Sequence, residues 1–169
     1  MAFFVSFIFS LVIYLALTFG SGNLFYWSKE EITLGIVLSA ITALIAGKIF
    51  DSLKIKVSPK FLNPIRWLLF LIYIIGPFLF ALIKANLEVA YRIITGKIKP
   101  GIVKISPGLK TDVGLTLLAN SITLTPGTLS VDIDKENNLY IHWLYVKNKE
   151  PSIEEVAENF TKWIKMITE

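Results

Sequence analysis

WLLFLIYIIGPFLFALIKANLEVAYRIIT, residues 67–95, decides the fold because its character changes along its length. Its first part, residues 67–83, carries no charged side chain. Such a run fits a bilayer core of about 30 Å, which requires about 17–25 apolar residues of a helix. Gly76 and Pro77 interrupt the run, and this pair is typical of a kink. From Lys84 onward the pattern becomes amphipathic, so the stretch predicts a kinked apolar helix at the border of a membrane region.

Two further runs without charged side chains, residues 1–28 and 32–47, precede this stretch. The chain is 54% hydrophobic and 18% charged, whereas soluble domains average about 25% charged residues. We expect two firm spans, over residues 3–19 and 29–50, the second opened by a Ser-x-x-Glu capping box. The first run lacks a basic start and exceeds the apolar part of a cleaved signal, so we expect it to be retained. The sequence predicts an integral membrane protein.

The second span carries a row of small side chains: Gly35, Ser39, Ala43 and Gly47. Residues four apart lie on the same side of a helix, so the row forms one face. In lipid, small side chains drive helix association by letting two backbones approach closely. The row therefore predicts a helix-packing face, whose partner is either the protein's own first helix or a helix of another subunit.

Basic residues concentrate in residues 48–66, between the second and third apolar segments. Because Lys- and Arg-rich loops stay in the cytoplasm, we expect this loop and the N-terminus inside, in a multi-pass protein of the plasma membrane. A full crossing by residues 66–95 places the C-terminal domain outside, and a re-entrant or surface-lying segment keeps it inside. The basic flank Lys97 and Lys99 favours the cytoplasm.

Lys84, Glu88 and Arg92 follow the third apolar run at four-residue spacing. Charged groups at membrane depth are candidates for an ion path. These three lie at the membrane boundary, where i, i+4 pairing and extension of long side chains toward water account for them. A proton or cation path calls for an acidic group in mid-span, and the three apolar runs contain none. We expect no ion path within this chain alone.

Residues 97–169 are predicted to form a soluble α+β domain after a helical membrane region, residues 1–96. Acidic residues outnumber basic ones in the last part of the chain, unlike in the first. Alternating and helical patterns predict, in order, a strand over 102–105, a helix over 112–122, strands over 129–133 and 139–146, and a helix from Pro151 onward. The expected order is β-α-β-β-α.

NSITLTPGT, residues 120–128, joins the predicted helix to the next strand. Pro followed by Gly favours a type II turn, whereas tight hairpins prefer types I′ and II′. We therefore expect a turn that redirects the chain, with threonine hydroxyls capping backbone groups. The residues assigned to this structural turn are Asn120, Thr123, Thr125, Pro126, Gly127 and Thr128.

Few side chains are suited to catalysis or to metal binding. The chain has no cysteine and a single histidine, His142, which excludes disulfides, iron–sulfur ligation and multi-histidine metal sites. Asp132 and Asp134 beside Glu136 suggest cation binding, but the glycine and the longer oxygen set of an EF-hand are missing. No cluster of basic and aromatic residues suits nucleic acid. We predict no catalytic residue, no metal, no cofactor and no nucleic-acid partner.

Three stretches carry a resemblance to a known family: KANLEVAYRIITGKIKPGIVKI (84–105), LLANSITLTPGTLSVDI (117–133) and LYIHWLYV (139–146). With the order of apolar spans, they resemble the E subunit of multisubunit monovalent cation/proton antiporters of the Mrp (Mnh) type. The resemblance implies an accessory subunit beside larger antiporter-like subunits that carry the ion path. Related subunits occur in archaeal membrane-bound hydrogenases and sulfur-reducing complexes, which couple ferredoxin oxidation to sodium/proton exchange. The family supplies no catalytic residue to transfer.

Three hypotheses follow for the function. The leading one is a non-catalytic membrane subunit of a Na+/H+ antiporter module, with other membrane subunits and the bilayer as partners. Its alternative setting is an archaeal hydrogenase or sulfur reductase complex. The Ile- and Lys-rich, cysteine-free composition is compatible with a thermophile, which agrees with that setting. The others are a membrane-anchored enzyme using His142 with Asp132 and Asp134, and an autonomous transporter.

Overall fold

The computed structural model describes residues 1–20, 26–54 and 58–169. These residues divide into two compact units, Met1–Pro64 and Ile65–Glu169. The third apolar helix thus belongs to the same unit as the α+β domain. The predicted division between a membrane region, 1–96, and a soluble domain, 97–169, concerns immersion in lipid and stays a prediction.

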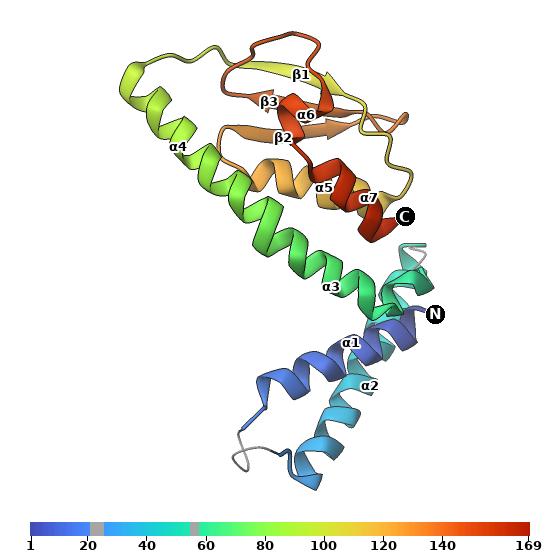
Figure 1. Cartoon of the computed structure of the whole chain (residues 1–169). Helices are drawn as coiled ribbons and strands as arrows, with labels where there is room; N and C mark the ends of the chain where they lie inside the picture. The colour runs from blue at the N-terminus through green and yellow to red at the C-terminus, as the bar shows by residue number, and fades with distance from the viewer. Residues whose placement is uncertain (21–25, 55–57) are drawn as a thin grey trace. The chain divides into compact units, whose positions relative to one another are not determined.

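The first unit is a pair of helices, α1 (Ala2–Leu17) and α2 (Lys29–Ser52), packed side by side (Figure 1). The predicted capping box is confirmed at the start of α2. The Glu31 amide donates to the Ser28 hydroxyl at 3.1 Å, and the Ser28 amide donates to the Glu31 carboxylate at 2.7 Å. These bonds satisfy backbone donors that a helix start leaves unpaired. A short 3₁₀ helix, η1 (Pro59–Leu62), follows in the connection to the second unit.

A helix of 32 residues, Pro64–Thr95, starts at the boundary of the two units and belongs to the second unit from Ile65 onward. It consists of α3 (Pro64–Tyr73), a π-helical segment η2 (Ile74–Phe78) and α4 (Leu79–Thr95). The π segment contains Gly76 and Pro77, so the predicted irregularity is confirmed as a local widening of one continuous helix. Gly96, with φ at +66°, ends α4 in the left-handed conformation that glycine adopts without strain.

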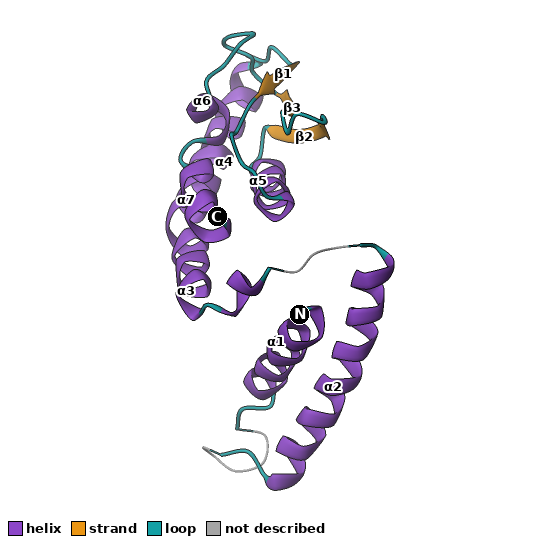
Figure 2. Ribbon diagram, turned by 90° about the vertical axis from the view of Figure 1, so that its right-hand side faces the viewer, coloured by secondary structure: helices purple, strands orange, loops and turns teal. Residues whose placement is uncertain are grey.

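A three-stranded antiparallel sheet follows, made of β1 (Gly101–Ile105), β2 (Thr128–Ile133) and β3 (Leu139–Trp143). The strand order is β1-β3-β2, with Val103 opposite Ile141 and Leu129 opposite His142. A register shift between Ser130 and Asp132 bends β2. Figure 2 shows the sheet above α5 (Asp112–Leu124), which connects β1 to β2.

The domain ends in two short helices, α6 (Ile153–Ala157) and α7 (Phe160–Thr168). The sequence predicts a single helix here, and the chain instead breaks at Glu158, whose φ is +45°. The core of the domain joins sheet and helices through side chains with almost no exposed surface, among them Leu118, Ile122, Leu139, Ile141 and Ile164. The predicted fold class, apolar helices followed by an α+β domain of β-α-β-β-α order, is confirmed with this last helix divided.

Candidate functional site

The small-residue row of α2 provides the buried surface of the first unit. Gly35, Ser39 and Ala43 are the buried residues of α2, whose neighbour is α1. A Cβ atom added to Gly35 would lie 2.6 Å from the Tyr14 ring of α1, so no larger residue fits without movement. Around Gly47, by contrast, nothing lies within 4 Å of an added Cβ. The row therefore meets the chain's own first helix at Gly35, and this contact does not extend to Gly47.

The third apolar helix holds the α+β domain through an aromatic cluster. The Tyr73 side chain is 1% exposed, and its hydroxyl donates to the Ser121 hydroxyl of α5 at 2.7 Å. Its ring lies edge-on to the Phe160 ring with centroids 5.9 Å apart, and the Phe78 ring lies 6.1 Å away. These contacts join α3, the π segment, α5 and α7 in one apolar core.

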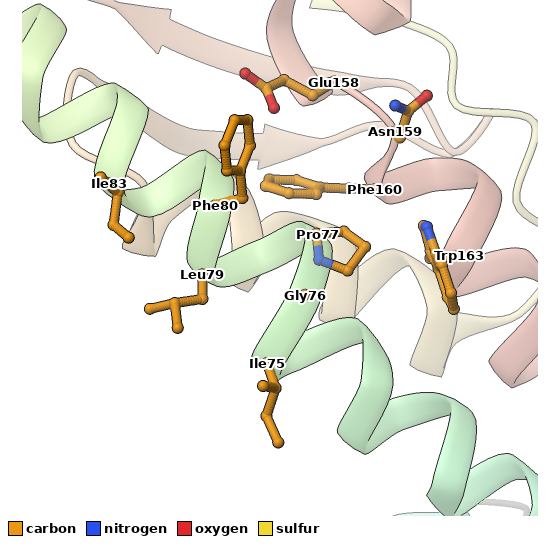
Figure 3. Close-up of a pocket in the computed structure, with 10 residues that line it drawn as sticks. All are labelled: Ile75, Gly76, Pro77, Leu79, Phe80, Ile83, Glu158, Asn159, Phe160 and Trp163. Carbon is orange, nitrogen blue, oxygen red and sulfur yellow. The ribbon is translucent and has the colours of Figure 1, made fainter.

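An open pocket of about 570 Å³ lies between the π segment and the break before α7 (Figure 3). Pro77, Phe160 and Trp163 lie on its walls, with Glu158 and Asn159 at its polar end. The Lys84 ammonium pairs with the Glu158 carboxylate at 2.8 Å beside this pocket, and both side chains reach solvent. π segments occur often at functional sites. Here the segment accommodates Pro77 where the helix meets α7, so its evident role is structural.

The three charged residues of α4 take part in two ion pairs, one with the α+β domain and one within the helix. Lys84 pairs with Glu158, and Glu88 pairs with Arg92 at the predicted i, i+4 spacing. The Arg92 guanidinium also lies 4.0 Å from the centroid of the Tyr145 ring and donates to the Lys97 carbonyl at 3.3 Å. A cation over an aromatic face is stabilised by the ring quadrupole. These charges therefore fasten α4 to the following domain.

The Pro-Gly turn is a structural joint with its threonine hydroxyls engaged. Gly127 has φ at +91°, as the third residue of a type II turn requires, and the Thr128 amide donates to the Thr125 carbonyl. The Thr125 hydroxyl donates to the Ser121 carbonyl at 2.7 Å, and the Thr123 hydroxyl accepts from the Ser130 amide at 3.1 Å. The expected capping is confirmed. Asn120 lies exposed on α5, and Pro126 is half-buried in the turn.

The Asp134 carboxylate is used to fold the turn between β2 and β3. It accepts hydrogen bonds from the side-chain nitrogen and the backbone amide of Asn138, at 2.9 Å each, and from the backbone amide of Glu136. These bonds, those of Asn138 above all, hold the pKa of Asp134 well below its usual range. Lys104 pairs with the same carboxylate at 3.1 Å, and this contact raises the pKa of the lysine. The Asp134 oxygens, which the sequence offered as cation ligands, are thus engaged in the turn.

His142 lies half-buried near the end of β3. Its neighbours across the sheet are Ile102 and Leu129, which supply no acid or nucleophile to activate it. Within residues 1–20, 26–54 and 58–169, no group of three or more His, Asp or Glu side chains is arranged to hold a metal ion.

Sequence reasoning missed the residues that join the third helix to the domain: Arg66, Tyr73, Ser121, Glu158 and Phe160. The Arg66 guanidinium donates to the Ile167 carbonyl at 2.6 Å, across a sequence separation of 101 residues. The sequence did offer one signal: the Tyr73 hydroxyl and the Arg66 charge lie in or beside an apolar segment. Because buried polar groups need hydrogen-bond partners, such residues indicate a contact with another part of the chain. That signal indicates a contact without naming the partner.

Comparison with known proteins settles the family. A family model described as a Na+/H+ ion antiporter subunit matches residues 7–167. The chain belongs to this family. The predicted resemblance is thereby confirmed, and the stretches that carried it lie within the matched region.

Two curated relatives of this antiporter-subunit family match part of the chain. The E subunit of the Na(+)/H(+) antiporter of Alkalihalophilus pseudofirmus is 43% identical over 101 residues, 58% of this chain and 64% of the relative. The E1 subunit of the Staphylococcus haemolyticus antiporter is 36% identical over 95 residues, 54% of this chain and 60% of the relative. The chain thus spans less than two thirds of the curated relatives' length.

A solved structure matches this family member over nearly its whole length. The matching chain comes from the membrane-bound sulfane sulfur reductase, an archaeal respiratory membrane complex. It is 39% identical, with a TM-score of 0.79, and the match covers 98% of each chain. Both units of the fold therefore have a counterpart in a membrane assembly.

Proposed function

We propose that the chain is a non-catalytic accessory subunit of a membrane assembly that exchanges Na+ for H+. The family match over residues 7–167 carries this proposal, because it includes both the apolar helices and the α+β domain. The partners are then the larger membrane subunits of the antiporter module, which supply the ion path, together with the bilayer.

The packing of charged residues supports an accessory role. A membrane ion path is lined by ionisable groups that face a cavity or the bundle interior. The charged residues of α4 instead pair with one another and with the α+β domain, and residues 1–28 and 32–47 carry no charged side chain. The proposed contribution of the chain is therefore structural. The helices α1 and α2 dock among other subunits, and the α+β domain supports the assembly on its cytoplasmic side.

The solved relative supports a second setting, a respiratory complex. Its chain is 39% identical to this one, a value between those of the two curated antiporter relatives, 43% and 36%. In that setting the same kind of chain belongs to an antiporter-like module coupled to a redox enzyme. The role of the chain, assembly without catalysis, is the same in both settings.

The experiment that tests the proposal is purification of the tagged full chain from its native membrane in mild detergent. We expect larger antiporter-type subunits to co-purify, and we expect vesicles lacking this chain to lose Na+/H+ exchange. Iron–sulfur or other redox subunits in the same preparation indicate the respiratory setting. A chain that purifies alone, or whose removal leaves exchange and assembly intact, contradicts the proposal.

Reconstitution of the isolated chain separates accessory from transport function. We expect no Na+ or H+ flux through vesicles that contain this chain alone, because its apolar runs carry no charged side chain. Flux above that of empty vesicles would show an autonomous transporter. A His142→Ala variant completes the test, since loss of the assembly's activity with normal assembly would support the enzyme hypothesis.

A further inference from the structure

The helix Pro64–Thr95 meets the length and hydropathy requirements of a membrane span, yet it has two different faces. One face packs on the α+β domain from near its first turn to its last. Arg66 reaches the Ile167 carbonyl, Tyr73 reaches Ser121, and Lys84 reaches Glu158. Near the end of the helix, Arg92 lies over Tyr145. The contacts thus span almost the entire helix.

All four charged side chains of this helix lie toward the domain or toward one another. Arg66, Lys84 and Arg92 contact the domain or the segment leading to it, and Glu88 pairs with Arg92. A span surrounded by hydrocarbon exposes every side of itself to lipid or to other membrane helices. Here the helix buries three residues, Tyr73, Ala81 and Arg92, and contacts a domain with a charged surface, including the exposed residues Glu154, Glu155, Lys162 and Lys165.

The opposite face is apolar except at the exposed Asn86, which follows Ile83 by three residues and Leu79 by seven. The side chains of Ile75, Leu79 and Ile83 extend away from Phe160 in Figure 3, and the same three residues also line the pocket beside the π segment. The side chains of this face, which we call the outer apolar face, are between 44% and 84% exposed: Ile65, Leu68, Ile72, Ile75, Leu79, Ile83, Leu87 and Ile94. In α4 this face lies opposite Lys84, Glu88 and Arg92, and an apolar face opposite charged groups is one feature of helices that lie in a membrane interface.

The length of the helix alone does not decide its placement. Its 32 residues extend about 48 Å at about 1.5 Å per residue, whereas the charge-free residues 67–83 by themselves match a hydrocarbon core of about 30 Å. The attached domain argues against a crossing, because immersing the helix would carry the charged domain into hydrocarbon, where each charge is costly.

We propose that α3–η2–α4 lies in the plane of the membrane surface, with its outer apolar face inserted into the lipid. The occupant of this face is the bilayer itself. The lysines that follow the helix, Lys97 and Lys99, suit anionic lipid headgroups. The domain then sits on the water side of the helix.

Site-directed spin labelling of the full chain in lipid vesicles tests this placement directly. The chain has no cysteine, so single cysteines at Leu68, Ile75, Ile83 and Leu87 can each carry a nitroxide. Collisions with lipid-dissolved oxygen and with a water-soluble nickel chelate report depth. We expect all four labels at a similar shallow depth, about 5–10 Å below the headgroup boundary.

Two labels outside the helix calibrate the result. Leu44 on α2 should lie deep in lipid, and Leu124 at the end of α5, 65% exposed, should lie in water. A depth that is greatest at Ile75 and Ile83 and falls at both ends would show a crossing helix and overturn the proposal. Labels shielded from both oxygen and nickel would show that a protein covers the face, which also overturns it. Neither result depends on Na+/H+ exchange.

Discussion

α2 and the helix Pro64–Thr95 are equally suited to the membrane by composition, and they differ in what they pack against. An 18-residue apolar stretch of each helix has a mean hydropathy of 2.0 in α2 and 2.3 in the longer helix. α2 buries a row of small residues against α1 and exposes apolar side chains elsewhere. The longer helix buries Tyr73 and Ala81 in the core of an α+β domain. Hydropathy alone therefore does not distinguish a helix between helices from a helix that carries a soluble domain.

The largest expected effect comes from removing the aromatic anchor of the longer helix. Tyr73→Ala deletes a buried ring and the hydrogen bond to Ser121, and should lower the free energy of unfolding by about 3–5 kcal/mol. Thermal unfolding in detergent measures this. Ile72→Ala is the matched control, since Ile72 lies exposed on the outer apolar face. Equal losses in both variants would break the distinction between the two faces.

The second prediction concerns close packing in the first unit. Gly35→Ala places a Cβ against the Tyr14 ring and should destabilise the helix pair by about 1–3 kcal/mol. Gly47→Ala is the control and should leave the isolated chain unchanged, because nothing lies near that Cβ. Unfolding in detergent and assembly in native gels report the two effects separately. A larger loss for Gly47 in assembly alone would mark it as a contact with another subunit.

Local sequence patterns predicted most of the elements. The capping box, the Pro-Gly turn and the strand alternation depend on residues a few positions apart, and all three are present. The division of the last helix was missed, since Glu158 adopts φ at +45° with neither glycine nor proline to indicate it. The exposed pair of Glu158 with Lys84 is worth no more than about 1 kcal/mol and does not by itself account for this conformation.

The anchoring of the third helix could not be predicted, because it depends on distant pairs. Tyr73 and Ser121 are 48 residues apart, and Lys84 and Glu158 are 74 apart. A single sequence shows which side chains need partners but gives no register between elements so far apart. For the same reason the small-residue row predicted a packing face and left its partner open.

A third prediction concerns the turn that touches α4. Gly127→Ala should cost about 1–3 kcal/mol, because φ is +91° and the new Cβ lies 3.3 Å from a Val89 methyl of α4. Gly108→Ala, also at positive φ but with open space around it, separates backbone strain from contact with the helix. Unfolding curves of the two variants provide the comparison. A greater loss at Gly108 would contradict a role for the turn in holding α4.

The smallest expected effect lies at the exposed ion pair. Lys84→Gln removes the contact with Glu158 and should cost no more than about 1 kcal/mol, since both partners reach solvent. Raising the salt concentration should reduce the difference between variant and parent. Loss of Na+/H+ exchange with normal assembly and stability would contradict this structural role and indicate an ion path at the pair.

The most direct measurement compares the sidedness of the two helices in one experiment. Single cysteines at Glu30 and Ser52 mark the two ends of α2, and single cysteines at Ile65 and Thr95 mark the ends of the longer helix; all four positions are exposed. A thiol reagent that cannot cross membranes is applied to sealed vesicles of known orientation. We predict opposite sides for the ends of α2 and the same side for the ends of the longer helix. Opposite sides for Ile65 and Thr95 would contradict the account.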